Sequence, residues 1–166
     1  PGRAVDYLRQ GYTGKRAGTE AGGTVPRPIV APCFGSPFMP GGPTEYARML
    51  TDRIAEHGAD VWLLNTGWTG GGYGTGKRFS LEYTRAMVHA IIDGSLKRAS
   101  FTADPVFGLP IPDAVAGVPS EVLNPRNTWK DGAAYDAQAK KLAAMFRQND
   151  AKFEMRDFVR ESGPRG

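Results

Sequence analysis

The chain has 166 residues, the length of one domain and enough to bury a hydrophobic core. Its hydrophobic fraction of 40% and charged fraction of 23% exclude a disordered chain and argue against a membrane protein. The formal net charge of +4 comes with interspersed acidic residues and no basic stripe, so nucleic-acid binding is not expected. With one cysteine, no internal disulfide can form, and without a recognisable leader we expect a cytoplasmic protein.

The first third of the chain is rich in glycine and proline. Arg3–Gln10 has a helical pattern, whereas the composition of Gly11–Pro32 predicts an irregular loop. The next predicted helix runs to Glu56 with Thr44 as its N-cap. Gly58 then supplies the left-handed residue that ends it.

A predicted buried strand and a glycine-rich loop follow. Val61–Asn65 is a continuous apolar run of strand-forming residues, and Thr66–Lys77 is the loop. The next helix, from about Ser80 to Asp93, is expected to bury one side, formed by Leu81, Thr84, Val88, Ile91 and Ile92. Strand, glycine loop and helix is the order in which α/β proteins present phosphate sites.

The last third predicts a turn and a long helix. Pro105–Pro112 cannot form a central strand, because proline lacks the donor that a ladder needs. Asn124–Thr128 has turn chemistry and precedes a helix from about Gly132 to Gln148, with a buried stripe of Tyr135, Ala139, Leu142, Ala143 and Phe146. Residues 154–166 are expected to be a C-terminal tail. The mixture of elements predicts an α/β (mixed α+β) fold.

The glycine loop comes close to a Walker A motif and then departs from it. Gly71, Gly76 and Lys77 match G-x-x-x-x-G-K, but the next position must be Ser or Thr to hold Mg²⁺, and Arg78 stands there. A self-sufficient P-loop is therefore rejected. Two interpretations remain. The segment is either a flexible loop that delivers Lys77 and Arg78 to phosphates or a base, or an ordinary surface turn with two solvated cations. Their place directly before a helix N-terminus favours binding.

Four segments, in register, resemble ATP-dependent phosphoenolpyruvate carboxykinase. They are GYTGKRAGTE (Gly11–Glu20), CFGSPF (Cys33–Phe38), NTGWTGGGYGTGKRFSLEYTRA (Asn65–Ala86) and GVPSEVLNPRNTW (Gly117–Trp129). Their order and spacing are similar to those in the C-terminal portion of that enzyme. The resemblance implies that residues 1–153 are the C-terminal part of its nucleotide-binding domain, incomplete as a stand-alone domain.

The resemblance also implies an activity and a site. The family is a carboxy-lyase that converts oxaloacetate and ATP to phosphoenolpyruvate, ADP and CO₂ in gluconeogenesis, with Mg²⁺ and Mn²⁺. The family positions that match Arg78, Phe79 and Thr84 contact the nucleotide, and Lys77 is assigned to the same site from its place in the loop. The family's P-loop, metal ligands and oxaloacetate-binding arginines lie upstream. No catalytic residue or metal ligand is therefore expected in this chain, which should be inactive without the remainder of the carboxykinase.

Other interpretations stay open at this point. Without the resemblance, Phe79 would be a packing residue and Thr84 a helix hydroxyl bonded to its own backbone. The chain would then be a stand-alone nucleotide- or phosphate-binding module, or a subunit that needs a companion chain, without catalysis of its own.

Overall fold

The computed structural model describes residues 11–15, 27–31, 38–72, 74–152 and 163–164. These residues form helices and three two-stranded antiparallel sheets, which confirms the predicted mixed α/β class. The chain divides into two compact units, one of residues 1–61 and 142–165 and one of residues 62–141 with residue 166. The helix predicted at Arg3–Gln10 and the predicted boundary at residue 153 lie outside the described residues.

The first unit contains a strand pair where the sequence predicted an irregular loop. β1 (Gly11–Lys15) pairs antiparallel with β2 (Arg27–Ala31), and Gly11 lies opposite Ala31. The prediction for Gly11–Pro32 is therefore wrong for these two segments. In a two-stranded sheet each strand has a partner on one side only, so a proline inside β2 can direct its nitrogen, which lacks a hydrogen, to the unpaired side. Pairing also satisfies backbone hydrogen-bonding groups, whatever the loop-like composition of the segment.

The helix α2 (Pro43–His57) in the same unit begins two residues earlier than predicted. Gly42, not Thr44, is its N-cap, because the proline at the first helical position sets the helical φ without needing a donor. The predicted end is confirmed: Gly58 has a φ of 60°, and its N–H donates to the carbonyl oxygen of Ile54 at 2.9 Å.

The second unit is built around one hydrophobic core. Helix α3 (Leu81–Ile92) and the 3₁₀ turn η2 (Leu96–Arg98) pack against a tight turn closed by Val115 and Val118. Ala90, Leu96 and the two valines are buried at the centre. Partly buried apolar residues surround them: Trp62, Tyr83, Ala86, Met87, Ile91, Ala99, Val122 and Leu123.

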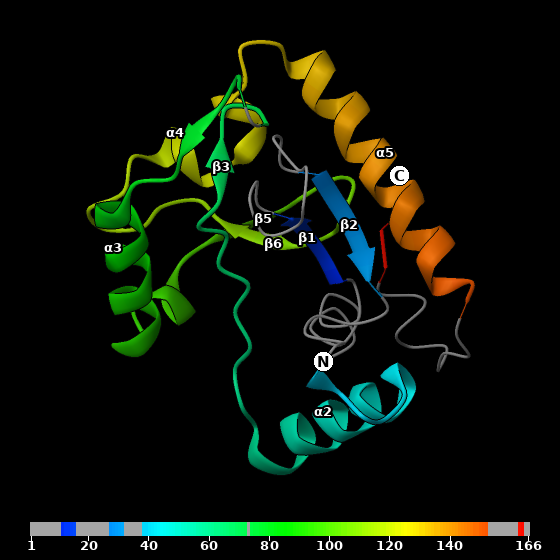
Figure 1. Ribbon diagram of the computed structural model, residues 1–166. Helices are drawn as coiled ribbons and strands as arrows, with labels where there is room; N and C mark the ends of the chain where they lie inside the picture. Colours follow the sequence, from blue (N-terminus) through cyan, green and yellow to red (C-terminus); the bar gives the residue numbers. More distant parts are fainter. Residues whose placement is uncertain (1–10, 16–26, 32–37, 73, 153–162, 165–166) are drawn as a thin grey trace. The chain divides into compact units, whose positions relative to one another are not determined.

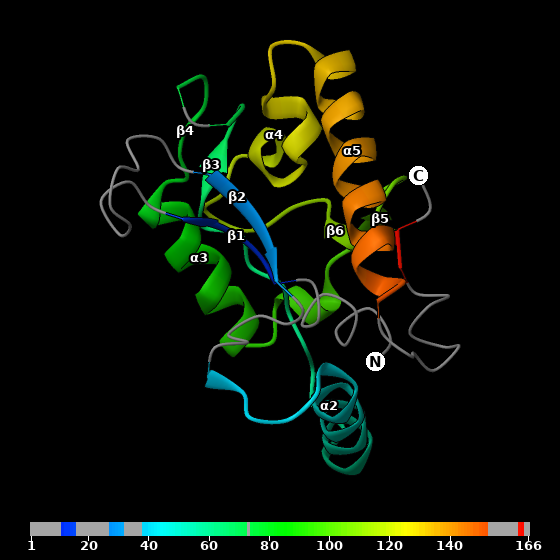
Figure 2. The ribbon, with the colours of Figure 1, turned by 45° about the vertical axis from the view of Figure 1, so that its right-hand side comes forward.

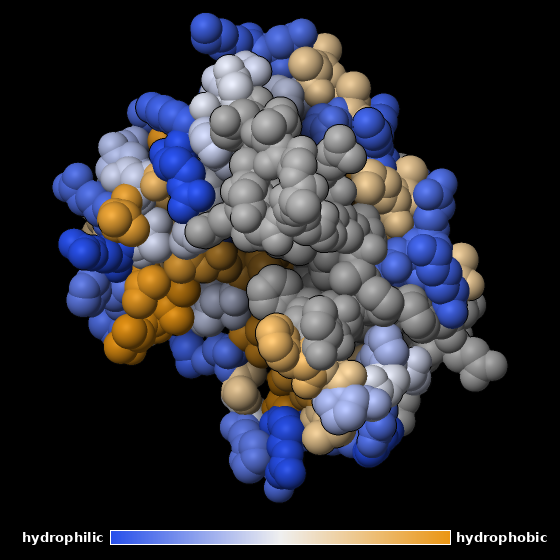
Figure 3. Space-filling model, in the orientation of Figure 1, coloured by the Kyte–Doolittle hydropathy of each residue, from blue (hydrophilic) through white to orange (hydrophobic). Residues whose placement is uncertain are grey.

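α3 buries only part of the side predicted: Ile91 packs against the core, as predicted, whereas other residues of that side do not. Leu81 and Ile92 are 70% and 78% exposed, and Val88 is exposed as well. Tyr83, Met87 and Ala90 face the core instead. The helix carries apolar residues on two sides, so periodicity alone could not tell which side packs. Hydrophobic residues gather over α3 on the surface shown in Figure 3.

A proline-containing strand pair follows η2. β5 (Phe101–Ala103) pairs antiparallel with β6 (Pro110–Pro112), with Thr102 opposite Ile111. The two prolines of β6 are two residues apart, so both of their donorless nitrogens point away from β5. This agrees with the prediction that Pro105–Pro112 is no central strand.

The predicted turn and long helix are confirmed. The short helix α4 (Ser120–Leu123) leads into the 3₁₀ turn η3 (Pro125–Thr128), and α5 (Gly132–Asp150) follows. Figures 1 and 2 both show the beginning of α5 beside the α4–η3 segment. The buried stripe of α5 includes the predicted Ala139, Ala143 and Phe146, and it also includes Asn149, which was missed.

None of the helices among the described residues combines the length and the apolarity that crossing a membrane requires.

Neighbouring isoleucines on α3 test which side of the helix packs. Ile91→Ala is expected to destabilise the fold by about 1–2 kcal/mol, less than full burial would give, because Ile91 only partly contacts the core. Ile92→Ala makes the same change in helix propensity and should stay within about 0.5 kcal/mol of wild type. Urea unfolding of the two variants measures the difference, and a larger effect at Ile92 would contradict the assigned core.

Candidate functional site

The apolar run before the glycine loop does not form the predicted strand. Val61–Asn65 has no strand partner among the described residues, and Val61 and Leu63 are 51% and 65% exposed. A strand exists only where a neighbouring chain completes its hydrogen-bond ladder, and an apolar pattern does not provide that neighbour. The prediction of a buried strand directly before the loop is therefore wrong for this structure.

The glycine loop is instead a tight β-hairpin. β3 (Trp68–Thr69) pairs antiparallel with β4 (Lys77–Arg78), so Trp68 lies opposite Arg78 and Thr69 opposite Lys77. The N–H of Phe79 donates to the carbonyl oxygen of Gly67 at 2.9 Å and closes the base. We call residues 67–79 the glycine hairpin. The chain folds back along itself before α3 begins, unlike a P-loop, which passes directly into its helix.

The hairpin depends on a close backbone approach at Gly76. A Cβ atom there would overlap the carbonyl oxygen of Gly71 and lie 2.7 Å from that of Thr69. The carbonyl oxygen of Gly72 accepts the N–H groups of Thr75 and Gly76 at 3.1 and 2.8 Å, which tightens the same turn. No larger residue fits at this crossing without opening the hairpin.

The two basic residues of the loop are consecutive in β4. Successive strand residues point to opposite faces, so Lys77 and Arg78 present their charges on opposite sides of the hairpin. Both are exposed, and within the described part of the chain neither has an ion-pair partner. Trp68 is 40% exposed and shares the face of Arg78 as its cross-strand neighbour.

The two other predicted site residues follow at the start of α3. The ring of Phe79 packs edge-on against Tyr83, with ring centroids 6.1 Å apart. The hydroxyl of Thr84 donates to the carbonyl oxygen of Ser80 at 2.9 Å, as a helix-face threonine commonly does. Its oxygen keeps acceptor capacity, so Thr84 can accept a hydrogen bond from a ligand while its own proton is engaged. One short segment thus carries all four predicted residues.

A contact that the sequence analysis missed joins the hairpin to η3. The N–H of Gly70 donates to the hydroxyl oxygen of Thr128 at 3.0 Å, and that hydroxyl donates to the carbonyl oxygen of Pro125 at 2.7 Å. Gly70 and Thr128 are far apart in the sequence, so no local pattern could pair them. Only the turn chemistry of Asn124–Thr128 indicated that this segment is ordered.

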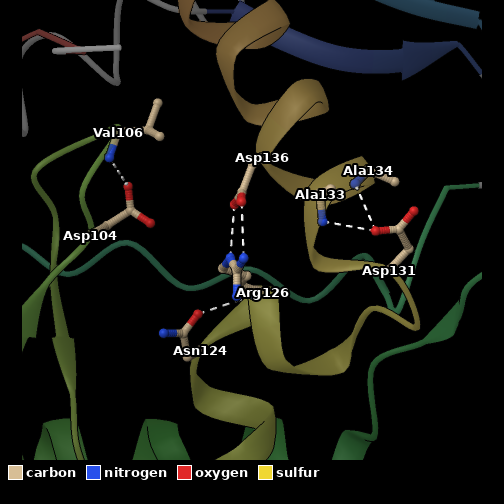
Figure 4. Close-up of polar contacts among 8 residues, drawn as sticks. All are labelled: Asp104, Val106, Asn124, Arg126, Asp131, Ala133, Ala134 and Asp136. Atoms are coloured by element: carbon tan, nitrogen blue, oxygen red, sulfur yellow. Dashed lines mark hydrogen bonds and ion pairs between the residues drawn. The ribbon is translucent and has the colours of Figure 1, made fainter.

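An ion pair fixes the same turn to α5. Arg126 donates through Nε and Nη2 to both carboxylate oxygens of Asp136, at 2.8 and 2.9 Å (Figure 4). These bonds favour the charged forms, so they lower the pKa of Asp136 and raise the pKa of Arg126. The side chain of Asn124 accepts the N–H of Arg126 at 3.1 Å and shapes the turn from its other end.

Among the described residues, no three His, Cys, Asp or Glu side chains are grouped so that they would hold a metal ion. The predicted site residues are instead two cations, Lys77 and Arg78, with the ring of Phe79 and the hydroxyl of Thr84.

Comparisons with known proteins identify the family. The sequence model of phosphoenolpyruvate carboxykinase matches residues 1–121, which include the glycine hairpin and α3. The chain belongs to this family. The resemblance on which the site residues were predicted is thereby confirmed, while the individual roles of Lys77, Arg78, Phe79 and Thr84 stay predictions.

Curated relatives carry the name of the ATP-dependent enzyme. Phosphoenolpyruvate carboxykinase (ATP) 1 of Moorella thermoacetica is 57% identical over 152 residues, covering 92% of this chain and 29% of that protein. The enzyme of Lysinibacillus sphaericus is 58% identical over 151 residues, covering 91% and 29%. A second Moorella protein is 52% identical over 163 residues, covering 98% and 31%. The chain thus spans about three tenths of the length of these relatives.

Two glycines of the hairpin form a matched test of its geometry. Gly76→Ala should cost about 1–3 kcal/mol, because the new Cβ meets fixed backbone. Gly72→Ala is the control, since a Cβ there has nothing within 4 Å, and it should stay within about 0.5 kcal/mol. Urea unfolding gives the cost, and amide exchange at Phe79 reports whether the hairpin opens. Equal effects of the two substitutions would argue against the hairpin.

Proposed function

We propose that this chain is part of an ATP-dependent phosphoenolpyruvate carboxykinase and contributes the adenine side of its ATP site. The observation that carries the proposal is the glycine hairpin, which presents Arg78 beside Trp68 directly before the N-terminus of α3. The enzyme converts oxaloacetate and ATP to phosphoenolpyruvate, ADP and CO₂. As the family resemblance implies, it acts in gluconeogenesis in the cytoplasm.

The exposed guanidinium of Arg78 suits an adenine face. A guanidinium is planar and weakly hydrated, so it stacks on an aromatic base and also donates to phosphate. Trp68, on the same face of the hairpin, offers a second flat surface next to it. Lys77 points to the opposite face, so it contacts a different part of the nucleotide from Arg78.

Phe79 and Thr84 complete this side of the site. Phe79 forms an apolar wall whose ring is supported by Tyr83. Because the proton of the Thr84 hydroxyl already goes to Ser80, Thr84 acts as an acceptor. Its partner is then a donor of the nucleotide, such as the amino group of adenine or a ribose hydroxyl.

The reaction divides between this chain and the rest of the enzyme. Cleavage of a carbon–carbon bond of oxaloacetate releases CO₂ and leaves an enolate, whose oxygen takes the γ-phosphoryl group of ATP. Such a transfer depends on positioning, and holding the base end fixes the direction of the phosphate chain. The residues that bind the phosphoryl end, oxaloacetate, Mg²⁺ and Mn²⁺ belong to the remainder of the carboxykinase. Those ions supply charge stabilisation there.

Replacement of Arg78 tests the nucleotide site. In the complete carboxykinase that carries this segment, Arg78→Ala should raise the Kd for ATP about 2- to 30-fold, because a cation–π contact is worth about 0.5–2 kcal/mol. Arg53→Ala removes the same charge from an exposed position on α2 and should leave the Kd unchanged. Isothermal titration calorimetry measures both. Equal affinities of wild type and Arg78→Ala would sink the proposed role.

The division of the active site makes a second prediction. The purified 166-residue chain should show no oxaloacetate-dependent turnover, because the groups that bind oxaloacetate and the phosphoryl end are expected outside it. A coupled assay for phosphoenolpyruvate measures this, with the complete carboxykinase as the positive control. Turnover by the purified chain would overturn the proposed division.

A further inference from the structure

The η3 turn lies against the glycine hairpin without contributing any predicted ligand contact. The backbone of the two segments approaches closely: a Cβ on Gly70 would lie 3.1 Å from the carbonyl oxygen of Thr128. Gly70 also has a φ of 75°, a left-handed conformation in which glycine is unstrained. The N–H of Gly70 therefore comes close enough to η3 to donate to the side-chain hydroxyl of Thr128.

The Thr128 hydroxyl is oriented before it meets the hairpin. Its proton goes to the carbonyl oxygen of Pro125 at 2.7 Å, which turns an oxygen lone pair toward the N–H of Gly70. A hydroxyl with both its donor and its acceptor engaged has one rotational position. The turn thus offers a fixed acceptor rather than a rotating one.

The turn itself is held from two sides. Arg126 forms the two-bond ion pair with Asp136 of α5, a geometry that fixes orientation as well as distance. Its guanidinium lies over the start of the helix, where a Cβ on Gly132 would be 2.9 Å from Nη2. Trp129, directly after the turn, packs edge-on against Tyr135 with centroids 5.6 Å apart. Figure 4 shows Arg126 between the turn and the helix.

The fixed point is close to the predicted nucleotide contacts. Gly70 is bonded to Thr69, and Thr69 is the cross-strand partner of Lys77. Arg78 is the next residue of β4. A displacement of Gly70 therefore reaches Lys77 through one peptide bond and one strand pair, and it reaches Arg78 through one further peptide bond. The same chain of contacts runs from α5 through Arg126 and Thr128 to β4.

We propose that Thr128 is a positioning residue for the nucleotide, and that the Arg126–Asp136 pair holds it in place. Thr128 does not touch ATP; it fixes the hairpin so that Arg78 meets the base in one geometry. This inference rests on the proposed function of the hairpin. It assigns to the Asn124–Trp129 segment a part in nucleotide affinity, beyond its part in folding.

The test compares isosteric variants in the complete carboxykinase. Thr128→Val keeps the shape but removes both hydrogen bonds, and it should raise the Kd and KM for ATP about 3- to 10-fold. The KM for oxaloacetate should not change. Thr128→Ser restores the hydroxyl and should return the ATP affinity to within twofold of wild type. Thr102→Val, which removes a hydroxyl bond to Asp113 in another hairpin, is the matched control and should bind ATP normally.

Each outcome decides between the proposals. If Thr128→Val binds ATP like wild type, or if Thr128→Ser is as weak as Thr128→Val, the positioning role is overturned. If Arg78→Ala also leaves the affinity unchanged, the proposed nucleotide site itself fails, and the positioning role fails with it. Should Thr128→Val not fold, Arg126→Lys tests the same link, because it keeps the charge and loses the two-bond geometry. Arg126→Lys should also raise the Kd for ATP, and an unchanged Kd would overturn the positioning role of Thr128.

Discussion

The close crossing of backbone inside the glycine hairpin is the constraint on which the candidate site depends. Because Gly76 lies against the carbonyl oxygens of Gly71 and Thr69, the loop closes on itself and sets the register of β3 and β4. That register decides which side chains share a face. It pairs Arg78 with Trp68 and leaves Lys77 on the other side. The identity of one glycine thus fixes the direction of two charges.

The sequence predicted the parts of the fold whose signals are local. Gly58 ends α2 through its own left-handed conformation, and the stripe of α5 follows from spacing within one helix. Val61–Asn65 fails as a strand because a strand needs a partner that its own residues do not encode. α3 shows the same limit, since apolar residues lie on more than one side of the helix, and only the core around Leu96 and Val118 determines which of them are buried.

In the candidate site, too, the local features could be predicted from the sequence and the long-range contacts could not. Arg78, Phe79 and Thr84 were predicted from a motif that is continuous in the sequence, and the structure keeps them within one segment. The bond from Gly70 to Thr128 joins residues that no window includes together. The sequence also left open whether the Thr84 hydroxyl is bonded to its own helix backbone or is available to a nucleotide. The structure shows that this hydroxyl donates to the carbonyl oxygen of Ser80. Motifs therefore indicated the candidate site, and the structure adds which of its donors and acceptors are engaged within the protein.

Placement of cations on a hairpin, rather than in a P-loop, has a chemical consequence. A P-loop surrounds phosphates with backbone N–H groups that converge on one anion. In the glycine hairpin the N–H groups of Gly70, Thr75, Gly76 and Phe79 already donate to protein oxygens. These N–H groups are engaged within the protein, whereas the side chains of Lys77 and Arg78 are exposed. Flat, exposed groups such as those of Arg78 and Trp68 suit a base better than a phosphate chain, because stacking needs a surface and no converging donors.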